Sequence, residues 1–433
     1  MSKKINLLGI VCLCWLSFAQ AQTDNSPYSR YGLGDLVPAQ NMVTRGMGGV
    51  SAAYYDFNTI NFLNPASYAR LQATTLDFGL ELNNHTLRTN NPPKKFNTYS
   101  PNISYVQLGF PIKKGGGWGV NVGLRPITRV NYKIGQLSRM RAAVPGDTLD
   151  ISTIYEGNGG TYEAHIGTGF SIAKGLTAGI NIGYMFGSRD YTSRILPLDT
   201  VAYNYKASYE AKTSYGGLVY NAGLQYTAKL SSKSWLRLGA FGNLKHELRA
   251  KSDSTVETFE YNSNTGAVDS IDVVHRVKDL SGKITYPASF GVGVIFDRPG
   301  KWLIGVDYTQ QKWSDYRVYG RKEPVQDSWN LHIGGQITPT GGKTYWSYVG
   351  YRGGFTYGKD YINVDKELSV WTISLGAGFP MRKPAYTNQF SVINTILEFG
   401  KRGNNNSIVR ENFFRIGVGL SLSDIWFQKY KYD

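Results

Sequence analysis

Short segments in which apolar residues alternate with small or polar residues recur along most of this chain. The pattern is clearest in residues 118–125, 176–184, 371–379 and 414–422. Successive side chains of a β-strand point to opposite faces, so each segment has one apolar face and one small or polar face. No later part of the chain has the roughly eighteen consecutive apolar residues of a membrane helix. The sequence therefore predicts an all-β protein whose strands meet lipid on one side and a lumen on the other.

About fourteen such segments can be counted, an even number, as closure of bacterial outer-membrane barrels usually requires. They lie near residues 74–83, 101–111, 117–132, 160–173, 176–189, 213–229, 235–250, 283–296, 301–315, 327–338, 344–358, 367–380, 389–401 and 411–423. Short Gly-, Pro-, Asp- and Lys-containing turns alternate with longer loops, which are expected near 84–100, 133–159, 190–212 and 251–282. The last loop is rich in Ser, Asp, Glu and Thr and is expected to be partly disordered. The prediction is a membrane-spanning antiparallel β-barrel over residues 74–423, followed by a C-terminal tail over 424–433.

Tryptophans gather near the ends of the predicted strands. Four of them, Trp118, Trp235, Trp302 and Trp346, lie beside short turns, and Trp313, Trp329 and Trp371 lie near long loops. This distribution predicts two aromatic girdles at the two membrane interfaces.

Residues 1–21 have the organisation of a secretory signal peptide. Lys3 and Lys4 precede an apolar core, and Ala19-Gln20-Ala21 forms a cleavage site before Gln22. The apolar run is too short for a membrane anchor. Both cysteines, Cys12 and Cys14, lie in this segment, so the exported chain is expected to have no disulfide and no thiolate site. The predicted location is the outer membrane.

The formal net charge is +16. Export disfavours nucleic acid as a partner. Outer-membrane lipid and phosphate-rich lipopolysaccharide, an anionic substrate or an acidic protein fit the charge better, and a spread of Lys and Arg over loops and lumen explains it most simply.

The stretch 44–69 is too polar and too rich in glycine for a membrane strand. Gly46, Gly48 and Gly49 permit unusual backbone or close approach to another surface. Asn64-Pro65-Ala66 turns the chain, because proline fixes its own φ and restricts the preceding residue. Residues 22–73 are therefore expected to form a lead-in and a compact N-terminal hatch inside the barrel lumen.

These residues carry a resemblance. The pattern formed by Gly46, Gly48, Gly49, Asp56, Asn64, Pro65 and Ala66 resembles the N-terminal hatch of the FadL-type outer-membrane transporters. The resemblance implies a fourteen-strand barrel and passive uptake of hydrophobic, fatty-acid-like molecules. The opening Ser-Pro-Tyr-Ser-Arg-Tyr-Gly at residues 26–32 resembles exported barrel proteins of Bacteroidetes-type bacteria.

One proline interrupts a predicted wall strand. Pro126 follows Arg125 in the third strand and precedes Arg129. Proline removes a ladder donor and is normally confined to edges, strand starts and bulges. In FadL-type transporters a kinked third strand opens a lateral portal, and Arg125, Pro126 and Arg129 are the residues here that match that role. A harmless bulge near the rim explains the proline equally well.

No catalytic constellation is evident. The five histidines are scattered without metal-ligand spacing, and no phosphate-binding glycine loop is present. No enzymatic activity, metal or cofactor is expected. Two functions remain open: passive transport of a hydrophobic ligand, and service as an interaction subunit of an outer-membrane complex, such as a Bacteroidetes-type protein secretion apparatus.

Overall fold

A computed structural model describes residues 26–90, 93–113, 115–141, 148–198, 205–262, 264–339, 342, 344–364, 366–381, 389–404, 407 and 409–424. The predicted signal peptide and all but the first residue of the predicted C-terminal tail lie outside the described residues.

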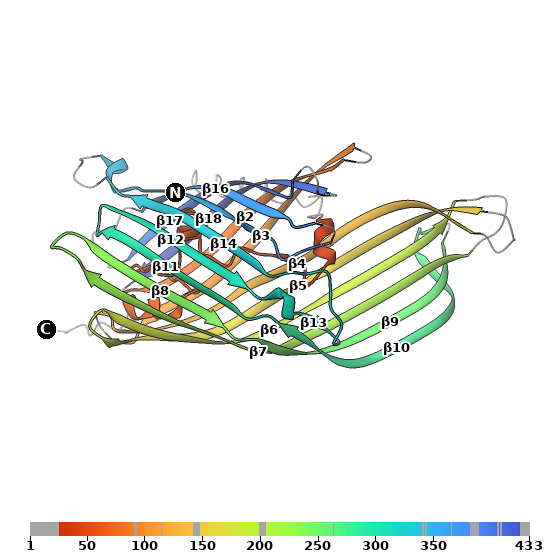
Figure 1. Cartoon of the computed structure of the whole chain (residues 1–433), viewed down its shortest axis with the longest axis horizontal. Helices are drawn as coiled ribbons and strands as arrows, with labels where there is room; N and C mark the ends of the chain where they lie inside the picture. Colours follow the sequence, from red (N-terminus) through yellow and green to blue (C-terminus); the bar gives the residue numbers. More distant parts are fainter. Residues whose placement is uncertain are drawn as a thin grey trace, which may run out of the picture.

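The chain forms a closed antiparallel β-barrel (Figure 1). Its long strands are β2 (Thr74–Asn90), β3 (Pro93–Pro111), β4 (Trp118–Arg141), β5 (Thr148–Ala173), β6 (Leu176–Pro197), β7 (Lys206–Lys229), β8 (Trp235–Asn243), β9 (His246–Tyr261), β10 (Val268–Tyr286), β11 (Ser289–Arg298), β12 (Trp302–Gln311), β14 (Ser328–Ile337), β15 (Gly350–Lys359), β16 (Ser369–Pro380), β17 (Phe390–Arg402) and β18 (Val409–Asp424). β8 continues into β9, and β10 continues into β11, so each of these two pairs counts as one wall strand and the barrel has 14 wall strands. Pairing of β18 with β2, from Asp424↔Thr74 to Val409↔Thr89, closes it.

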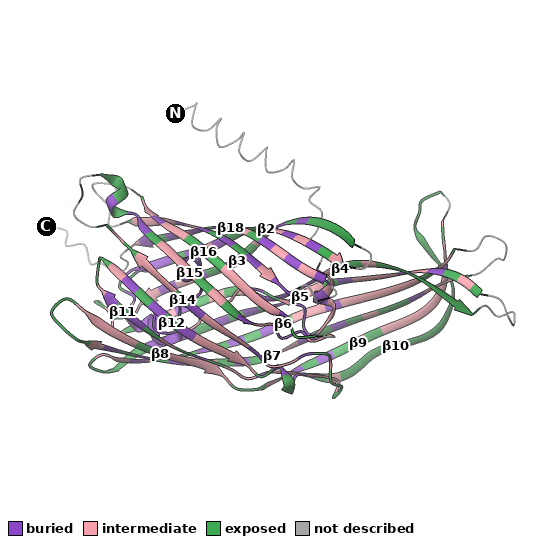
Figure 2. Ribbon diagram, turned by 45° about the horizontal axis from the view of Figure 1, so that its top comes forward, coloured by how far each residue is buried: buried purple, intermediate pink, exposed green. Residues whose placement is uncertain are grey.

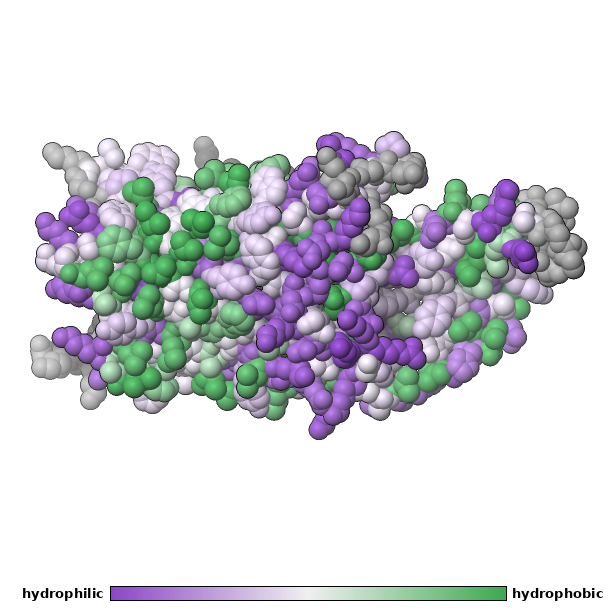
Figure 3. Space-filling model, in the orientation of Figure 1, coloured by the Kyte–Doolittle hydropathy of each residue, from purple (hydrophilic) through white to green (hydrophobic). Residues whose placement is uncertain are grey.

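The predicted fourteen-strand barrel is confirmed, and the alternation has the expected structural meaning. Ile180 and Ile182 of β6 are exposed on the outer face, whereas Asn181 between them is buried. The outward apolar side chains form a band around the left half of the molecule in Figure 3. Strands cross the outer membrane in closed barrels of this kind. Within the described ranges, helices are all too short and too polar to traverse a bilayer.

The predicted long loops are largely wrong, because strands occupy most of them. Six strands run on past the apolar band and form what we call the extension: residues 130–141 of β4, 148–159 of β5, 189–197 of β6, 206–213 of β7, 252–261 of β9 and 268–280 of β10. It is the sheet that projects to the right in Figures 1 and 2. Within it, the segment expected to be partly disordered is a long hairpin, β9–β10.

The extension was missed because it lacks the alternation on which strand prediction depended. Its outer face carries a row of charges across four strands: Lys133 with Glu156 at 2.6 Å, Arg194 with Glu156 at 3.1 Å and Arg194 with Glu210 at 3.7 Å. Outside the membrane this face meets water, so no apolar set marks it in the sequence.

Trp313 does not belong to a girdle. It lies in the short helix η3 (Trp313–Asp315), is fully buried, and packs on Tyr361 with ring centroids 4.2 Å apart. Trp118 is exposed on the outer face and fits the girdle prediction.

Candidate functional site

The N-terminal segment contacts wall strands on every side of the barrel. Its elements are η1 (Pro27–Arg30), β1 (Asp35–Leu36), α2 (Met42–Arg45) and η2 (Pro65–Arg70). Wall residues from well-separated strands form hydrogen bonds with this segment. They include Glu81 of β2, Asn181 of β6, Asp307 of β12 and Glu398 of β17. Such contacts require the segment to lie across the lumen.

The glycine-rich stretch lies against the barrel wall. Asn41 caps α2 by accepting from the Thr44 amide at 2.9 Å, and Gly48 and Gly49 then adopt φ values of 66° and 88°. A Cβ on Gly48 would lie 2.7 Å from the backbone nitrogen of Phe355. Both the positive φ and the lack of space for a side chain therefore favour glycine at this position. The third predicted glycine, Gly46, lies beside the backbone of Gly376.

Asn64 joins the segment to the wall. It is fully buried, and its side-chain amide donates to the carbonyl oxygens of Ala52 at 2.7 Å and of Leu224 and Ala240 at 3.2 Å each. Its side-chain oxygen accepts from the Ala66 amide at 3.1 Å and so caps η2, which begins at Pro65.

Asp56 has a more local role. Its side chain accepts from the amide of the next residue, Phe57, at 2.7 Å. The portal arginines Arg125 and Arg129 pair with the wall glutamates Glu163 and Glu81.

A buried charge network holds α2 in place. The Arg45 guanidinium donates to Glu81 at 2.6 Å and to both oxygens of Glu398 at 2.7 and 3.0 Å. Arg129 reaches Glu81 at 3.0 Å, and Arg415 lies 3.6 Å from Glu398. Removing one member of such a network leaves charges buried without compensation, which is strongly destabilising.

A second cluster anchors the lead-in. Arg402 forms ion pairs with Asp35, Asp360 and Glu411 at 2.7, 2.7 and 3.2 Å, and its guanidinium lies over the Tyr28 ring. Tyr28 donates to the Val409 carbonyl oxygen at 2.7 Å, and burial raises its pKa to about 12, so the phenol stays neutral.

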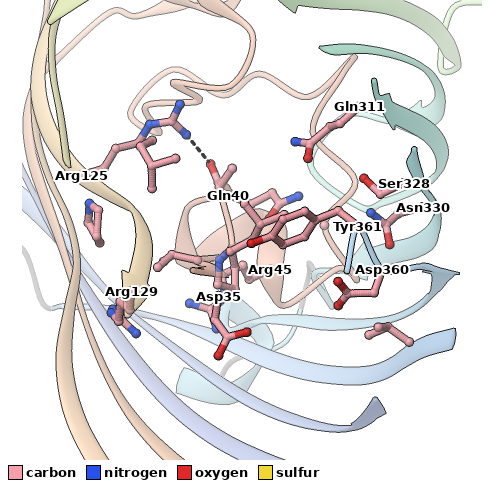
Figure 4. A pocket seen from close by; sticks show the side chains of 18 of the residues that line it. Asp35, Gln40, Arg45, Arg125, Arg129, Gln311, Ser328, Asn330, Asp360 and Tyr361 are labelled. Carbon is pink, nitrogen blue, oxygen red and sulfur yellow. Dashed lines mark hydrogen bonds between the residues drawn. The ribbon is translucent and has the colours of Figure 1, made fainter. Parts of the chain in front are cut away.

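A cavity of about 770 Å³ lies between the N-terminal segment and the wall. Figure 4 shows Arg125 and Arg129 on one side of the cavity and Gln311 and Asn330 on the other, with Arg45 and Tyr361 between them. Apolar side chains, among them Leu36, Ile127, Met185 and Phe290, share the lining with these polar groups. An amphipathic ligand would suit this mixed surface better than a purely apolar one.

The cavity reaches a place where two wall strands part. The β3–β4 ladder ends at Val106↔Leu124, although both strands continue beyond these residues. Past this point β1 takes the place of β3, with Asp35↔Arg129 and Leu36↔Thr128 paired and the Val37 amide donating to the Ile127 carbonyl at 3.0 Å. We call this junction the β3–β4 gap.

Pro126 stands directly at the gap. It follows the last β3-paired residues, faces Tyr162 of β5, and precedes a bulge at Ile127, after which β4–β5 pairing resumes at Thr128↔Thr161. The bulge shifts the alternation by one residue, so Thr128 takes the inward phase of β4. The Arg129 side chain still reaches Glu81 and the cavity.

The two arginines of the predicted portal are both paired. Arg125 donates to Glu163 at 2.9 Å, and Arg129 to Glu81 at 3.0 Å. These glutamates lie on β5 and β2, and the only sequence signal for them was an acid in the inward phase of a predicted strand. In the described part of the chain, no group of three or more His, Cys, Asp or Glu side chains is arranged to hold a metal ion.

The fold is similar to those of several solved outer-membrane channels. The CymD monoaromatic hydrocarbon channel shares 17% identity at a TM-score of 0.53, over 93% of this chain and 100% of that chain. The Pseudomonas putida toluene transporter TodX shares 17% identity at 0.55, over 91% and 100%. A Pseudomonas aeruginosa FadL homologue shares 13% identity at 0.57, over 92% and 100%. The fold expected from the FadL-type resemblance is therefore confirmed.

No curated protein matches the sequence. A family model does, over residues 1–433, and by that match the chain belongs to the BamG family.

Proposed function

We propose that this protein lets small hydrophobic or amphipathic molecules cross the outer membrane passively, with the β3–β4 gap as a lateral exit. The observation that carries the proposal is the position of the cavity, whose lining includes Pro126 and Ile127 at the gap and Tyr99 and Pro101 of β3 across it. The similarity in fold to CymD, a monoaromatic hydrocarbon channel, and to the toluene transporter TodX supports this class of cargo.

A lateral route fits the arrangement of charges better than an axial one. Axial passage would require α2 to leave, which breaks the buried bonds of Arg45 to Glu81 and Glu398. Lateral passage requires displacement of the two-residue strand β1 from β4 and, at Asp35, the loss of one of the three carboxylates around Arg402. In this proposal the hatch stays in place except at residues 35–37, which form its movable part.

The cargo would have an apolar body and a polar head. The exposed Tyr99 and Ile103 of β3 offer an apolar path on the membrane side of the gap. Arg125 and Arg129 lie on the cavity side, where an anionic head such as a carboxylate would compete with Glu163 and Glu81. Fatty-acid-like molecules meet both conditions.

The test is uptake by intact cells that carry only the variant, since the lipopolysaccharide leaflet blocks spontaneous entry. Val37→Pro removes the amide that bonds Ile127 and should raise uptake of radiolabelled oleate several-fold. Pro126→Val, which adds an amide at the gap, should lower it, while Val274→Pro on the far side of the extension serves as the control. Equal uptake in all three, at equal surface levels, would refute the lateral route.

A second function has one specific observation in its favour. The extension projects beyond the apolar band, and among the described residues its outermost strands, β4 and β10, each have one side that pairs with no strand beyond the short covers β1 and β13. An interaction subunit of an outer-membrane complex, such as a Bacteroidetes-type secretion apparatus, would use such a projection to bind another protein. Copurification of a large partner from mild detergent would support this role.

A further inference from the structure

The extension has two edges that differ in how they are protected. One edge is β4, bonded near the membrane to β1 and, through the Asn131 carbonyl and amide, to Ser26 and Ser29. The other is β10, covered near the membrane by β13 (Arg317–Val318). Beyond these short covers, and among the described residues, β4 pairs only with β5 and β10 pairs only with β9.

The β10 edge carries devices that discourage pairing. Its register with β9 shifts three times, between Ser270 and Asp272, Val273 and His275, and Val277 and Leu280. Asp279 adopts a φ of 54°. Bulges of this kind twist an edge away from a straight incoming strand.

The β4 edge is regular. From Thr128↔Thr161 to Arg141↔Thr148 its pairing with β5 has no register shift. The Asn131 amide and carbonyl point away from β5, in the plane of the sheet. The direction of these groups alternates along a strand, so those of Gly135, Leu137 and Arg139 also point away from β5. Leu137 is 77% exposed, which is unusual for a leucine that no lipid covers. An unguarded, straight edge of this kind is a template for another strand.

The charge of this edge restricts what pairs with it. Residues 134–141 contain Arg139 and Arg141 and no acidic residue. Arg139 already pairs with Asp150 of β5 at 2.6 Å, so Arg141 is the cation that an added strand would meet. A second copy of this chain, paired edge to edge, would bring like charges together, which destabilises cross-strand pairs. A strand with acidic side chains would complement them.

We propose that the β4 edge from Ile134 to Arg141 is a strand-addition site for an acidic extended segment of a partner protein. The added strand would bond the outward groups of Gly135, Leu137 and Arg139 and cover the Leu137 side chain. Strand addition gives affinity through main-chain bonds and specificity through alternate side chains. This inference rests on the interaction role, the second of the two functions proposed above.

The experiment compares variants of the full chain purified from native membranes in mild detergent. Leu137→Pro removes one outward amide and leaves the bonds to β5 intact, whereas Val274→Pro places proline in a β10 bulge as the matched control. Arg141→Glu reverses the charge of the edge without breaking the Arg139–Asp150 pair. Particle mass is measured by light scattering, and amide exchange is followed at Gly135, Leu137 and Arg139.

The proposal is supported if a partner copurifies with the unmodified chain and with Val274→Pro and protects these amides from exchange. Its recovery should fall at least tenfold with Leu137→Pro. Arg141→Glu should also lower its recovery several-fold, and an unchanged recovery would refute an acidic segment. A partner retained by Leu137→Pro would refute the edge and leave the interaction role standing. Absence of a partner from every sample would refute both the strand-addition site and the interaction role. If the partner is a second copy of this chain, and Leu137→Pro abolishes that dimer, the occupant of the edge is not a different protein.

Discussion

Single residues decide how firmly the N-terminal segment is held, and Arg45 is the foremost of them. It is 2% exposed and is bonded to two glutamates on opposite sides of the point where β18 closes on β2. The sequence motif that marks the hatch includes neither Arg45 nor its partners. Glycines and Asn64 are recognisable because they serve local backbone needs, whereas Glu81 and Glu398 are brought to Arg45 by register between distant strands.

Arg45→Met should loosen the segment, because Glu81 and Glu398 would stay buried with weaker compensation. Loss of one partner of a buried pair costs about 3–5 kcal/mol. The folded band on unboiled gels should disappear at a lower temperature, and conductance in planar bilayers should rise. Combining Arg45→Met with Glu398→Gln should restore part of the loss, and Arg139→Met, at an exposed pair, should change neither quantity. A wild-type melting profile for Arg45→Met would contradict the role of the network.

Asn64→Leu should have a smaller effect of the same sign. It removes the Asn64 donor from the carbonyls of Leu224 and Ala240, whereas the Ala52 carbonyl keeps Gln225 at 3.0 Å, and an unsatisfied buried polar group costs roughly 1–3 kcal/mol. The gel assay and bilayer conductance measure it, with Asn97→Leu on the exposed β2–β3 hairpin as the control. If Asn64→Leu left both melting and conductance unchanged, Asn64 would not join segment to wall.

At the scale of elements, the strands fall into a predictable set and an unpredictable one. Within the membrane, lipid on one face and lumen on the other impose the period of two, so all fourteen segments were located from sequence. The extension has water on its outer face and lost that signal. A bulge was one of the two explanations for Pro126, but the proline does not show whether the phase of the strand shifts after it.

The outer half of the β9–β10 hairpin should be dispensable for folding. Replacing residues 255–276 by Asn-Gly keeps Leu248 and Ile284, which are fully buried in the cluster around Trp313 and Tyr316. The shortened chain should therefore melt close to the full chain on unboiled gels. Leu248→Ala, by contrast, should destabilise by about 2–5 kcal/mol through a core cavity. An unfolded product from the shortening alone would show that the outer hairpin stabilises the barrel.

At the scale of the whole molecule, the barrel combines a fixed obstruction with a weak point in its wall. Two ionic clusters, around Arg45 and Arg402, tie the N-terminal segment to the barrel, while β1 meets β4 through two residue pairs. The gap, the cavity and β1 lie together, and this coincidence supports lateral passage over axial passage. The gap arises because β3 and β4 stop pairing after Leu124 of β4, and no local sequence pattern indicates this.

The central claim can be tested at one position. Both cysteines lie in the predicted signal peptide, residues 1–21, so Leu36→Cys, at a 36% exposed position in β1, provides one labelling site in the chain expected after cleavage. The measurement is oleate uptake by intact cells before and after a bulky maleimide reacts with that cysteine. The account predicts that modification strongly lowers uptake, while the same reagent on Leu137→Cys, on the far part of β4, leaves it unchanged. Full uptake after complete modification of Leu36→Cys would contradict a lateral route past β1.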